Sequence, residues 1–518
     1  FILNGRLPYT GFFTHHNPMA YFVSAVAVLF SGPSFVKFRL VFGVFYLLGF
    51  ISLFFYVRKN WFKQEIIIIT WLITFLTISA TYTWGHMVLG DTLSAYFLLP
   101  SYLILVFIAL RGTKVRWEKV LVVSILAALA VLTSSAVVIT VLIIYAFLFF
   151  LFVSQCKLRF RDILLFITIV ITPYIIFFLY LVFSGSLNEF YRQAIRYTSD
   201  IYVQLPGGFT SRNPFRISII YFNEFLKNYR SIVLMIKDLN LANPFAPALA
   251  LSSLVFIVYL ILNRKFSLSV FVFLMLVYAS LRGNPYTTSE TDYQAIQYHF
   301  FSMFNGLAAI VYLWNSLSLN SNREIPKKII EGFMFVLLSV FMFFLFWLFF
   351  DKWWEKTYLK YMGQQALIYD RPPIAAILND LIPKNEYYFI APFDFEDQLY
   401  MKSKPASKYI VVLPGMDHLT YFQEEIIADL SDANPRIIVF NTDYRFFNSS
   451  TPHGLLVLDY INNKYTTINS LGLKKNGYTL KYEWMGNFNF ERHFFILKEK
   501  QDEIINEMIS KGYLIPPS

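Results

Sequence analysis

The sequence predicts a mainly α-helical membrane protein, in which a polytopic helical bundle is followed by a small α/β domain. Of the 518 residues, 57% are hydrophobic and only 15% are charged, whereas soluble domains carry about a quarter of charged residues. The apolar residues form runs long enough to cross a bilayer, which takes about 20 residues per helix. From Asp351 onward charges and prolines return. We therefore expect a membrane domain over 1–350 and an extracytoplasmic α/β domain over 351–518, and the composition excludes a soluble enzyme, a disordered chain and a disulfide scaffold.

Ten apolar runs are predicted to be membrane spans: 38–57, 66–84, 92–110, 120–134, 136–155, 162–183, 243–262, 266–281, 298–317 and 329–350. The long run 120–155 is interrupted by Thr133-Ser134-Ser135. We interpret it as a tight hairpin of two short helices; one very long helix is the alternative. Two further segments are predicted to lie in the headgroup plane. Residues 18–31 are apolar but only about two-thirds of a bilayer long, and residues 214–240 interleave apolar and aromatic residues with Arg and Lys.

The basic residues orient these helices, because cytoplasmic loops are rich in Lys and Arg. Basic loops follow every odd-numbered span, at 58–63, 111–119, 157–161, 264–265 and 323–328, whereas the connections 85–91 and 133–135 contain neither residue. Residues 1–37, 184–242, 282–297 and everything after 351 are then outside. This also explains the net charge of +11 without a nucleic-acid partner. With residues 1–37 outside, we expect a further span to precede Phe1.

The region after residue 351 alternates predicted strands and helices, which is typical of an α/β domain. The expected strands are Tyr387–Ile390, Tyr409–Leu413, Arg436–Phe440, Tyr478–Trp484 and His493–Lys498, and the expected helices are Ile374–Leu381 and Phe422–Leu430.

Asp91 is the first candidate for chemistry, because ionisable residues at membrane depth are costly and usually functional. It follows His86 in the short outer connection Gly85–Asp91. Asp also caps helices well, so an N-cap of a helix starting at Thr92 is the alternative reading, and the two roles are compatible.

A second candidate is the pair His15 and His16 in Thr14-His15-His16-Asn17-Pro18. Adjacent histidines beside a membrane are able to bind phosphate or a metal; the alternative is a set of interfacial polar residues before a helix. A closed zinc site is not expected, because the chain has one cysteine, Cys156, and its other histidines are scattered. We expect neither a metal nor a cofactor.

Cations in the outer loops form the third set. Basic residues on that side run against the usual topological bias, and arginine suits phosphate; lipid headgroups would explain them equally well. The set is Arg192, Arg196, Arg212, Arg216, Arg230, Arg282 and His299.

The first outer loop resembles that of GT-C glycosyltransferases. Gly5-Arg6-Leu7-Pro8-Tyr9, followed by Phe12 to Met19, is similar to the pattern of bacterial relatives of the family 39 protein O-mannosyltransferases and of aminoarabinose transferases. His16-Asn17-Pro18-Met19 falls on a Lys-Pro-Pro-Leu motif of the latter, which places His16 at a phosphate-binding lysine. Asp91 matches a second acidic position, and the outer domain, with Pro405–Tyr409, looks like their C-terminal domain.

The chain also departs from this pattern. Pro8-Tyr9-Thr10-Gly11 lacks an acidic residue that some relatives carry, and Arg282 lies farther before His299-Phe300 than expected. The principal catalytic aspartate of the family would precede Phe1, so the resemblance names no base here.

The resemblance implies transfer of a sugar from a polyprenyl-phosphate donor to a hydroxyl of a glycan, lipid or protein, at the outer face of a bacterial inner membrane and with inversion. An aspartate would act as general base. Cations would stabilise the departing phosphate, with candidates His15, His16, His86, Arg192, Arg196, Arg282 and His299. Asp91 would position hydroxyl groups or hold a basic neighbour.

Two other classes of function stay open. A transporter or flippase for a lipid-linked sugar would share the spans and the outer cations, but transporters favour internal repeats and midplane polar sites. A non-catalytic scaffold that binds glycan through its outer domain is the third class.

Overall fold

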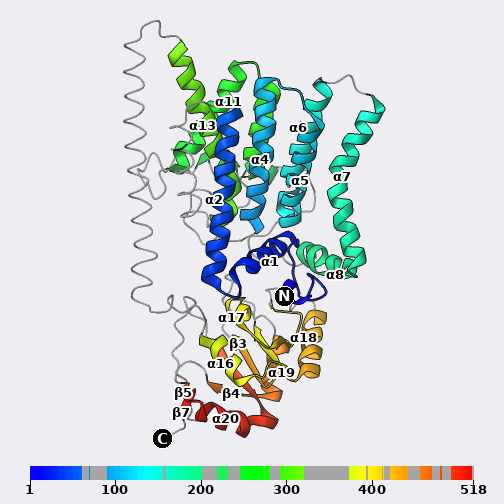
Figure 1. Ribbon diagram of the computed structural model, residues 1–518, viewed down its shortest axis with the longest axis vertical. Coiled ribbons are helices and arrows are strands. Elements are labelled where there is room, and N and C mark those ends of the chain that lie inside the picture. Colours follow the sequence, from blue (N-terminus) through cyan, green and yellow to red (C-terminus); the bar gives the residue numbers. More distant parts are fainter. Residues whose placement is uncertain are drawn as a thin grey trace.

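The computed structural model describes residues 1–60, 69, 90–155, 159–200, 219–220, 222–223, 225–227, 229–230, 245–279, 292–319, 373–391, 395–410, 412, 420–441, 455–469, 479–480 and 492–515. A bundle of long helices stands above a smaller α/β part in Figure 1. This confirms the predicted class, a helical membrane bundle with a small C-terminal α/β region. The domain boundary near 350 stays a prediction, because it falls outside the described residues.

The bundle contains helices at every predicted span that the described residues cover. They are α2 (Phe35–Asn60), α4 (Gly90–Arg111), α5 (Trp117–Thr133), α6 (Val138–Gln155), α7 (Phe160–Phe183), α11 (Phe245–Leu262), α12 (Phe266–Ala279) and α13 (Ile296–Leu319). Within the described residues, four segments are long and apolar enough to cross a membrane by themselves: Lys37–Lys59, Gly90–Arg111, Ser135–Gln155 and Phe160–Phe183. The predicted span 329–350, and 66–84 apart from residue 69, lie outside the described residues.

The run 120–155 is a hairpin, as predicted. Helix α5 ends at Thr133, Ser134 is extended, and a 3₁₀ turn, η2 (Ser135–Val137), leads into α6. The small hydroxyl residues of this turn end one helix and start the next, so the alternative of a single long helix is excluded.

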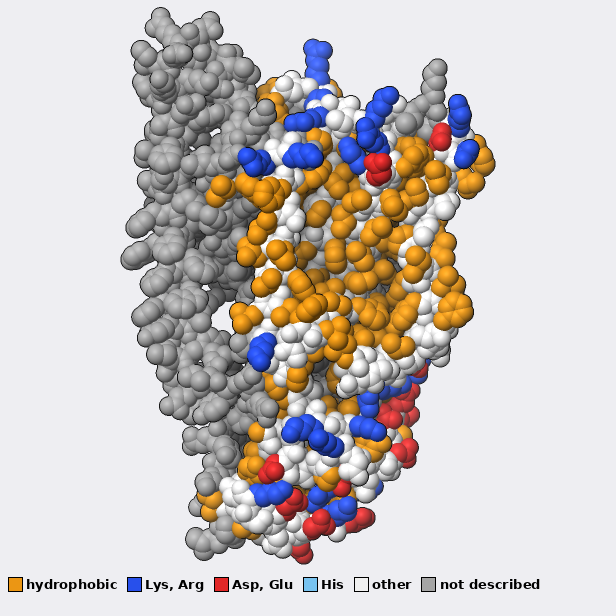
Figure 2. All heavy atoms as spheres, viewed as in Figure 1, with side chains coloured by type: hydrophobic (Ala, Val, Ile, Leu, Met, Phe, Trp, Pro, Cys, Tyr) orange, Lys and Arg blue, Asp and Glu red, His pale blue; other side chains and the backbone are white. Residues whose placement is uncertain are grey.

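The two ends of the bundle differ in charge. Helix ends that carry Arg58, Arg111 and Arg159 lie at one end, which we call the basic end, and the α/β part lies at the other, the domain end (Figure 1). Figure 2 shows a belt of apolar side chains between them. The geometry is that of an integral membrane protein; which end faces the cytoplasm stays a prediction.

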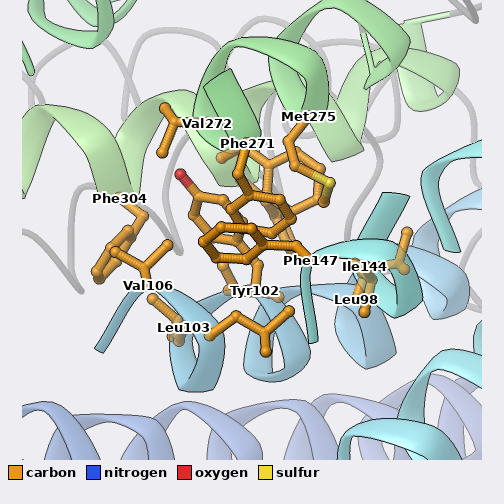
Figure 3. Packing of buried hydrophobic residues seen from close by; sticks show 14 of the residues in the cluster. Leu98, Tyr102, Leu103, Val106, Ile144, Phe147, Phe271, Val272, Met275 and Phe304 are labelled. Carbon is orange, nitrogen blue, oxygen red and sulfur yellow. The ribbon is translucent and has the colours of Figure 1, made fainter. Parts of the chain in front are cut away.

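Helix α4 is the centre of the bundle. In its most apolar 18-residue window 67% of the residues are buried, against 6% in the matching window of α7. The ring of Tyr102 packs among Phe271, Phe301 and Phe304, and Phe147 stacks on Phe271 with centroids 4.1 Å apart (Figure 3). Such close packing holds α4 in place within the bundle, and Asp91 is in the first turn of this helix.

The segment 18–31 forms helix α1 (Met19–Ser31), which is shorter than a span and lies across the domain end (Figure 1). The second predicted interfacial segment, 214–240, falls mostly outside the described residues.

The α/β part contains a five-stranded mixed sheet in the order β2-β1-β3-β6-β4. Strands β2 and β1 run parallel to β3, and β6 is antiparallel to both β3 and β4. The strands are β1 (Tyr387–Ala391), β2 (Lys404–Pro405), β3 (Ile437–Asn441), β4 (Tyr465–Asn469) and β6 (Arg492–Leu497). A second pair joins β5 (Thr479–Leu480) to β7 (Leu514–Ile515).

Helices cover both faces of this sheet. Alternate residues of a strand point to opposite sides, and in β3 the residues on both sides are apolar and need cover. Along β3, Ile437 and Val439 pack with α16 (Pro373–Leu381) and α20 (Gln501–Ser510). Ile438 and Phe440 pack with α18 (Thr420–Ala433) and α19 (Leu455–Lys464). The described residues also include a short helix, α17 (Phe395–Tyr400).

Most of the predicted α/β elements are confirmed, including both helices and the strands at 387–390, 436–440 and 493–498. The prediction of a strand at Tyr409–Leu413 is wrong for its described residues, which form no strand. The nearest strand is β2, which begins five residues before Tyr409. Tyr409 is buried by aromatic packing instead, and its N–H is bonded to the Ser407 hydroxyl. The strand expected at Tyr478–Trp484 is β5, and its other residues lie outside the described part.

Candidate functional site

The first loop, residues 1–18, is folded between the bundle and the α/β part. Tyr9 is fully buried with a positive φ of 75°, and its hydroxyl donates to the His16 carbonyl at 3.0 Å. The Tyr9 N–H bonds the Phe12 carbonyl at 2.9 Å. Gly11 closes this turn, because a Cβ there would lie 2.7 Å from the Leu7 nitrogen. The loop is therefore a compact structure and holds the two histidines in place.

His15 and His16 lie side by side, with ring centroids 3.8 Å apart. The Thr14 hydroxyl fixes the turn by accepting the His16 N–H at 3.1 Å and bonding the Tyr21 hydroxyl at 2.8 Å. Burial, and then the neighbouring His16, lower the pKa of His15 well below its usual 6.5. His15 is thus neutral at pH 7, whereas His16 is exposed at the surface of the turn.

Asp91 is buried, with 5% of its surface exposed. Among the described residues of the bundle it is the only buried acidic side chain. Helix α4 begins at Gly90, two residues before the expected start at Thr92. Asp91 is therefore in the first turn, where a carboxylate interacts favourably with the helix dipole. The Ser134 hydroxyl donates to Asp91 Oδ1 at 3.4 Å, and the Ser94 hydroxyl donates to its carbonyl at 2.8 Å.

Polar contacts connect the first loop to the helix ends around Asp91. Asn17 Nδ2 donates to the Val131 carbonyl, near the end of α5, at 2.6 Å, and three residues later Ser134 reaches Asp91. From α13, Gln297 Nε2 donates to the Ser94 hydroxyl, in the first turns of α4, at 3.1 Å. The described residues of the predicted stretches 14–18, 85–91 and 282–299 therefore lie at the same end of the bundle.

His299 is placed in the first turns of α13, after Gln297. Its side chain is 3% exposed, and its Nδ1 has no hydrogen-bond partner among the described residues. A buried unpaired ring nitrogen is uncommon in native proteins, so His299 has a free polar atom at the domain end.

Three arginines of the predicted set are described. Arg230 is exposed, and the other two, Arg192 and Arg196, have different surroundings. Arg192 is held between Glu189 at 2.6 Å and Glu425 at 2.5 Å; burial opposes its charge, but these carboxylates outweigh burial and raise its pKa. Arg196 is half-exposed, 3.7 Å from Asp200. Arg192 therefore joins the bundle to the α/β part, while Arg196 is accessible. His86, Arg212, Arg216 and Arg282 lie outside the described residues.

Sequence reasoning did not find Glu189, Gln193 or Glu425, which link the first loop to the α/β part. They belong to no motif, and their partners are up to 233 residues away, so only the fold brings them together. Among the described residues, no three His, Cys, Asp or Glu side chains lie close enough to hold a metal ion.

Comparisons with known proteins find a similar solved structure but do not assign this chain to a family. No family model matches the sequence, and no curated protein matches it either. Among solved structures it is similar to the crystal structure of ArnT from Cupriavidus metallidurans bound to undecaprenyl phosphate. The similarity covers 94% of this chain and 88% of that chain, with 13% identity and a TM-score of 0.45. A similarity of this size assigns no residue and no activity.

Proposed function

We propose that this chain is a membrane glycosyltransferase that moves a sugar from a polyprenyl-phosphate donor to an acceptor hydroxyl at the domain end. One observation carries the proposal: a buried carboxylate, Asp91, and an exposed imidazole, His16, lie at the same end of the bundle. The contacts of Asn17 and Ser134 connect them through the end of α5. The motif of the first loop supports the same activity.

The chemistry is a single displacement. The acceptor oxygen attacks the anomeric carbon, its proton passes to a carboxylate base, and the bond between that carbon and the phosphate oxygen breaks. The phosphate leaves with the electron pair, so the sugar inverts. Asp91 would orient the acceptor hydroxyl by accepting its hydrogen bond, in a site where burial strengthens such a bond.

The imidazole N–H groups of His15 and His16 would stabilise the charge on the departing phosphate, as preorganised donors do in acyl and phosphoryl transfer. His299, whose Nδ1 is unpaired within the part of the chain that the structure describes, and Arg196, which is accessible, are further candidates. Arg192 is a weaker candidate than the sequence indicated, because two carboxylates already neutralise it. A monophosphate leaving group carries less charge than a diphosphate, and the proposed step is written without a metal.

A transporter or flippase for the same lipid is the second candidate, and one observation favours it. Ser302 and Asn305 are buried within α13, and the Tyr102 hydroxyl donates to Asn305 Oδ1 at 2.5 Å. Polar groups inside a bundle are typical of transport paths.

The test is sugar transfer by membranes that contain the full chain, supplied with labelled polyprenyl-phosphate sugar. Asp91→Asn keeps the shape of the side chain but removes its charge, and we expect transfer to fall about 10²-fold, as for a lost orienting group. Asp162→Asn is the matched control, since Asp162 is in the first turn of α7 at the basic end. Wild-type transfer by the Asp91 variant would refute the role of Asp91. Movement of the lipid between leaflets without transfer would favour the flippase.

A further inference from the structure

One helical segment, Leu187–Asp200, lies between the first loop and the α/β part. It consists of α8 (Leu187–Phe190), the π-helix η3 (Tyr191–Arg196) and α9 (Tyr197–Asp200). π-Helices are rare and occur frequently at functional sites. Gln193 and Tyr197 are both fully buried, so one face of this segment is inserted into the protein.

Gln193 uses its whole amide group to hold the first loop. Its Oε1 accepts the backbone N–H of Thr14 at 3.0 Å, and its Nε2 donates to the Tyr9 carbonyl at 2.9 Å and to Glu189 Oε2 at 2.7 Å. Thr14 directly precedes His15. This side chain is therefore one of the groups that fix the position of the two histidines.

Other contacts of the segment reach the same turn. The ring of Tyr197 is 5.9 Å from that of His15 and 5.9 Å from that of Phe13, edge-on in both cases. The Thr198 hydroxyl donates to the His15 carbonyl at 3.5 Å. The segment thus contacts the turn through both backbone and rings.

The opposite side of the segment is bound to the α/β part by charge. Glu189 pairs with Lys408 at 3.4 Å, and Arg192 pairs with Glu425 at 2.5 Å. Lys408 and Glu425 are themselves paired at 3.1 Å, and the Tyr409 hydroxyl also donates to Glu425. Hydrogen bonds therefore run without a break from α18 through Glu189 to Gln193 and Thr14.

We infer that Gln193 is a positioning residue through which the docked α/β part aligns the His15-His16 turn. The α/β part then acts on the site although none of its residues belongs to the proposed chemistry. That the aligned turn serves phosphate binding rests on the proposed function. The coupling itself rests on the contacts alone.

The experiment measures hydrogen exchange of the Thr14 amide in the purified full-length protein, resolved by fragmentation. Gln193→Leu removes the acceptor of that N–H and leaves it and the Tyr9 carbonyl buried without partners, so the turn must open to water. We expect Thr14 to exchange at least about tenfold faster. Glu425→Gln, which weakens the docking from the other side, should also speed exchange at Thr14, and the double variant should show less than the product of the two effects.

Glu503→Gln is the matched control. Glu503 pairs with Arg436 at 3.0 Å on α20, which covers the opposite face of the sheet, so its loss should leave Thr14 unchanged. Where transfer is measurable, Gln193→Leu and Glu425→Gln should lower kcat while the KM for the acceptor is kept, and both should weaken binding of polyprenyl phosphate alone.

Wild-type protection of Thr14 in both variants would overturn the inference, as would equal acceleration by Glu503→Gln, which would indicate general destabilisation. If Gln193→Leu does not accumulate, Glu425→Gln decides alone, because its side chain is one-third exposed and its loss leaves no cavity. If the wild-type chain transfers no sugar, the proposed function fails, and the exchange of Thr14 still decides the coupling.

Discussion

Replacing Phe13 with alanine should release the first loop from the α/β part. The Phe13 side chain is 3% exposed, and its ring lies 5.4 Å from that of Tyr409, 5.6 Å from that of Phe422 and 5.9 Å from that of Tyr197. Truncating a buried Phe costs about 3–5 kcal/mol. The backbone bond from its N–H to the Lys408 carbonyl would remain. At about 1.4 kcal/mol per factor of ten, the undocked population should rise about 10²- to 10³-fold or more.

Tryptic cleavage after Arg6, followed by mass spectrometry in mild detergent, measures this population. When opening and closing are fast, the cleavage rate follows the equilibrium fraction of open molecules. Phe183→Ala is the matched control, because the same side chain at the end of α7 is 85% exposed. A cleavage rate for Phe13→Ala within threefold of the Phe183→Ala rate would refute the shared core.

Two further predictions concern the same loop. Burial lowers the pKa of His15, so the unfolded chain binds its proton more readily, and stability should be complete above about pH 6.5 and fall as the pH drops below that value. His15→Gln should flatten the decline of the thermal midpoint between pH 7.5 and 5; an unchanged slope would exclude His15 as its cause. Gly11→Ala should destabilise the loop by about 1–3 kcal/mol, because the added Cβ meets backbone atoms at 2.7–2.8 Å. Gly49→Ala, in open space on α2, should not, and equal midpoints would contradict this account.

The helices of the bundle could be predicted because an apolar run of span length has few other stable forms in a bilayer. The turn at Thr133–Ser135 could be predicted because three hydroxyl residues interrupt an otherwise apolar run. The prediction of a strand at Tyr409–Leu413 failed because apolar residues indicate that a segment is buried but not that it is a strand. Tyr409 is buried by the rings of Phe13 in the first loop and Phe422 in α18. Polar helices such as α20 have a weaker apolar signal and were missed.

The candidate site was predicted only in part. Asp91 and the histidines stand out locally, because polar residues are rare beside spans. Gln193 does not, since a glutamine in a polar loop is ordinary and its partners Tyr9 and Thr14 are 184 and 179 residues away. Its role depends on the docking of three distant segments.

Phe12 and Phe13 belong to the same hydrophobic cluster as Phe440 and Phe495 of the sheet, and this has a consequence for biogenesis. About 400 residues separate the aromatic pair from Tyr409. At about 5–20 residues per second, a ribosome needs about 20–80 s to make that stretch. During this time Phe12 and Phe13 lack the aromatic partners that bury them. The first loop can therefore reach its folded position only after the α/β part has been synthesised and has docked onto it.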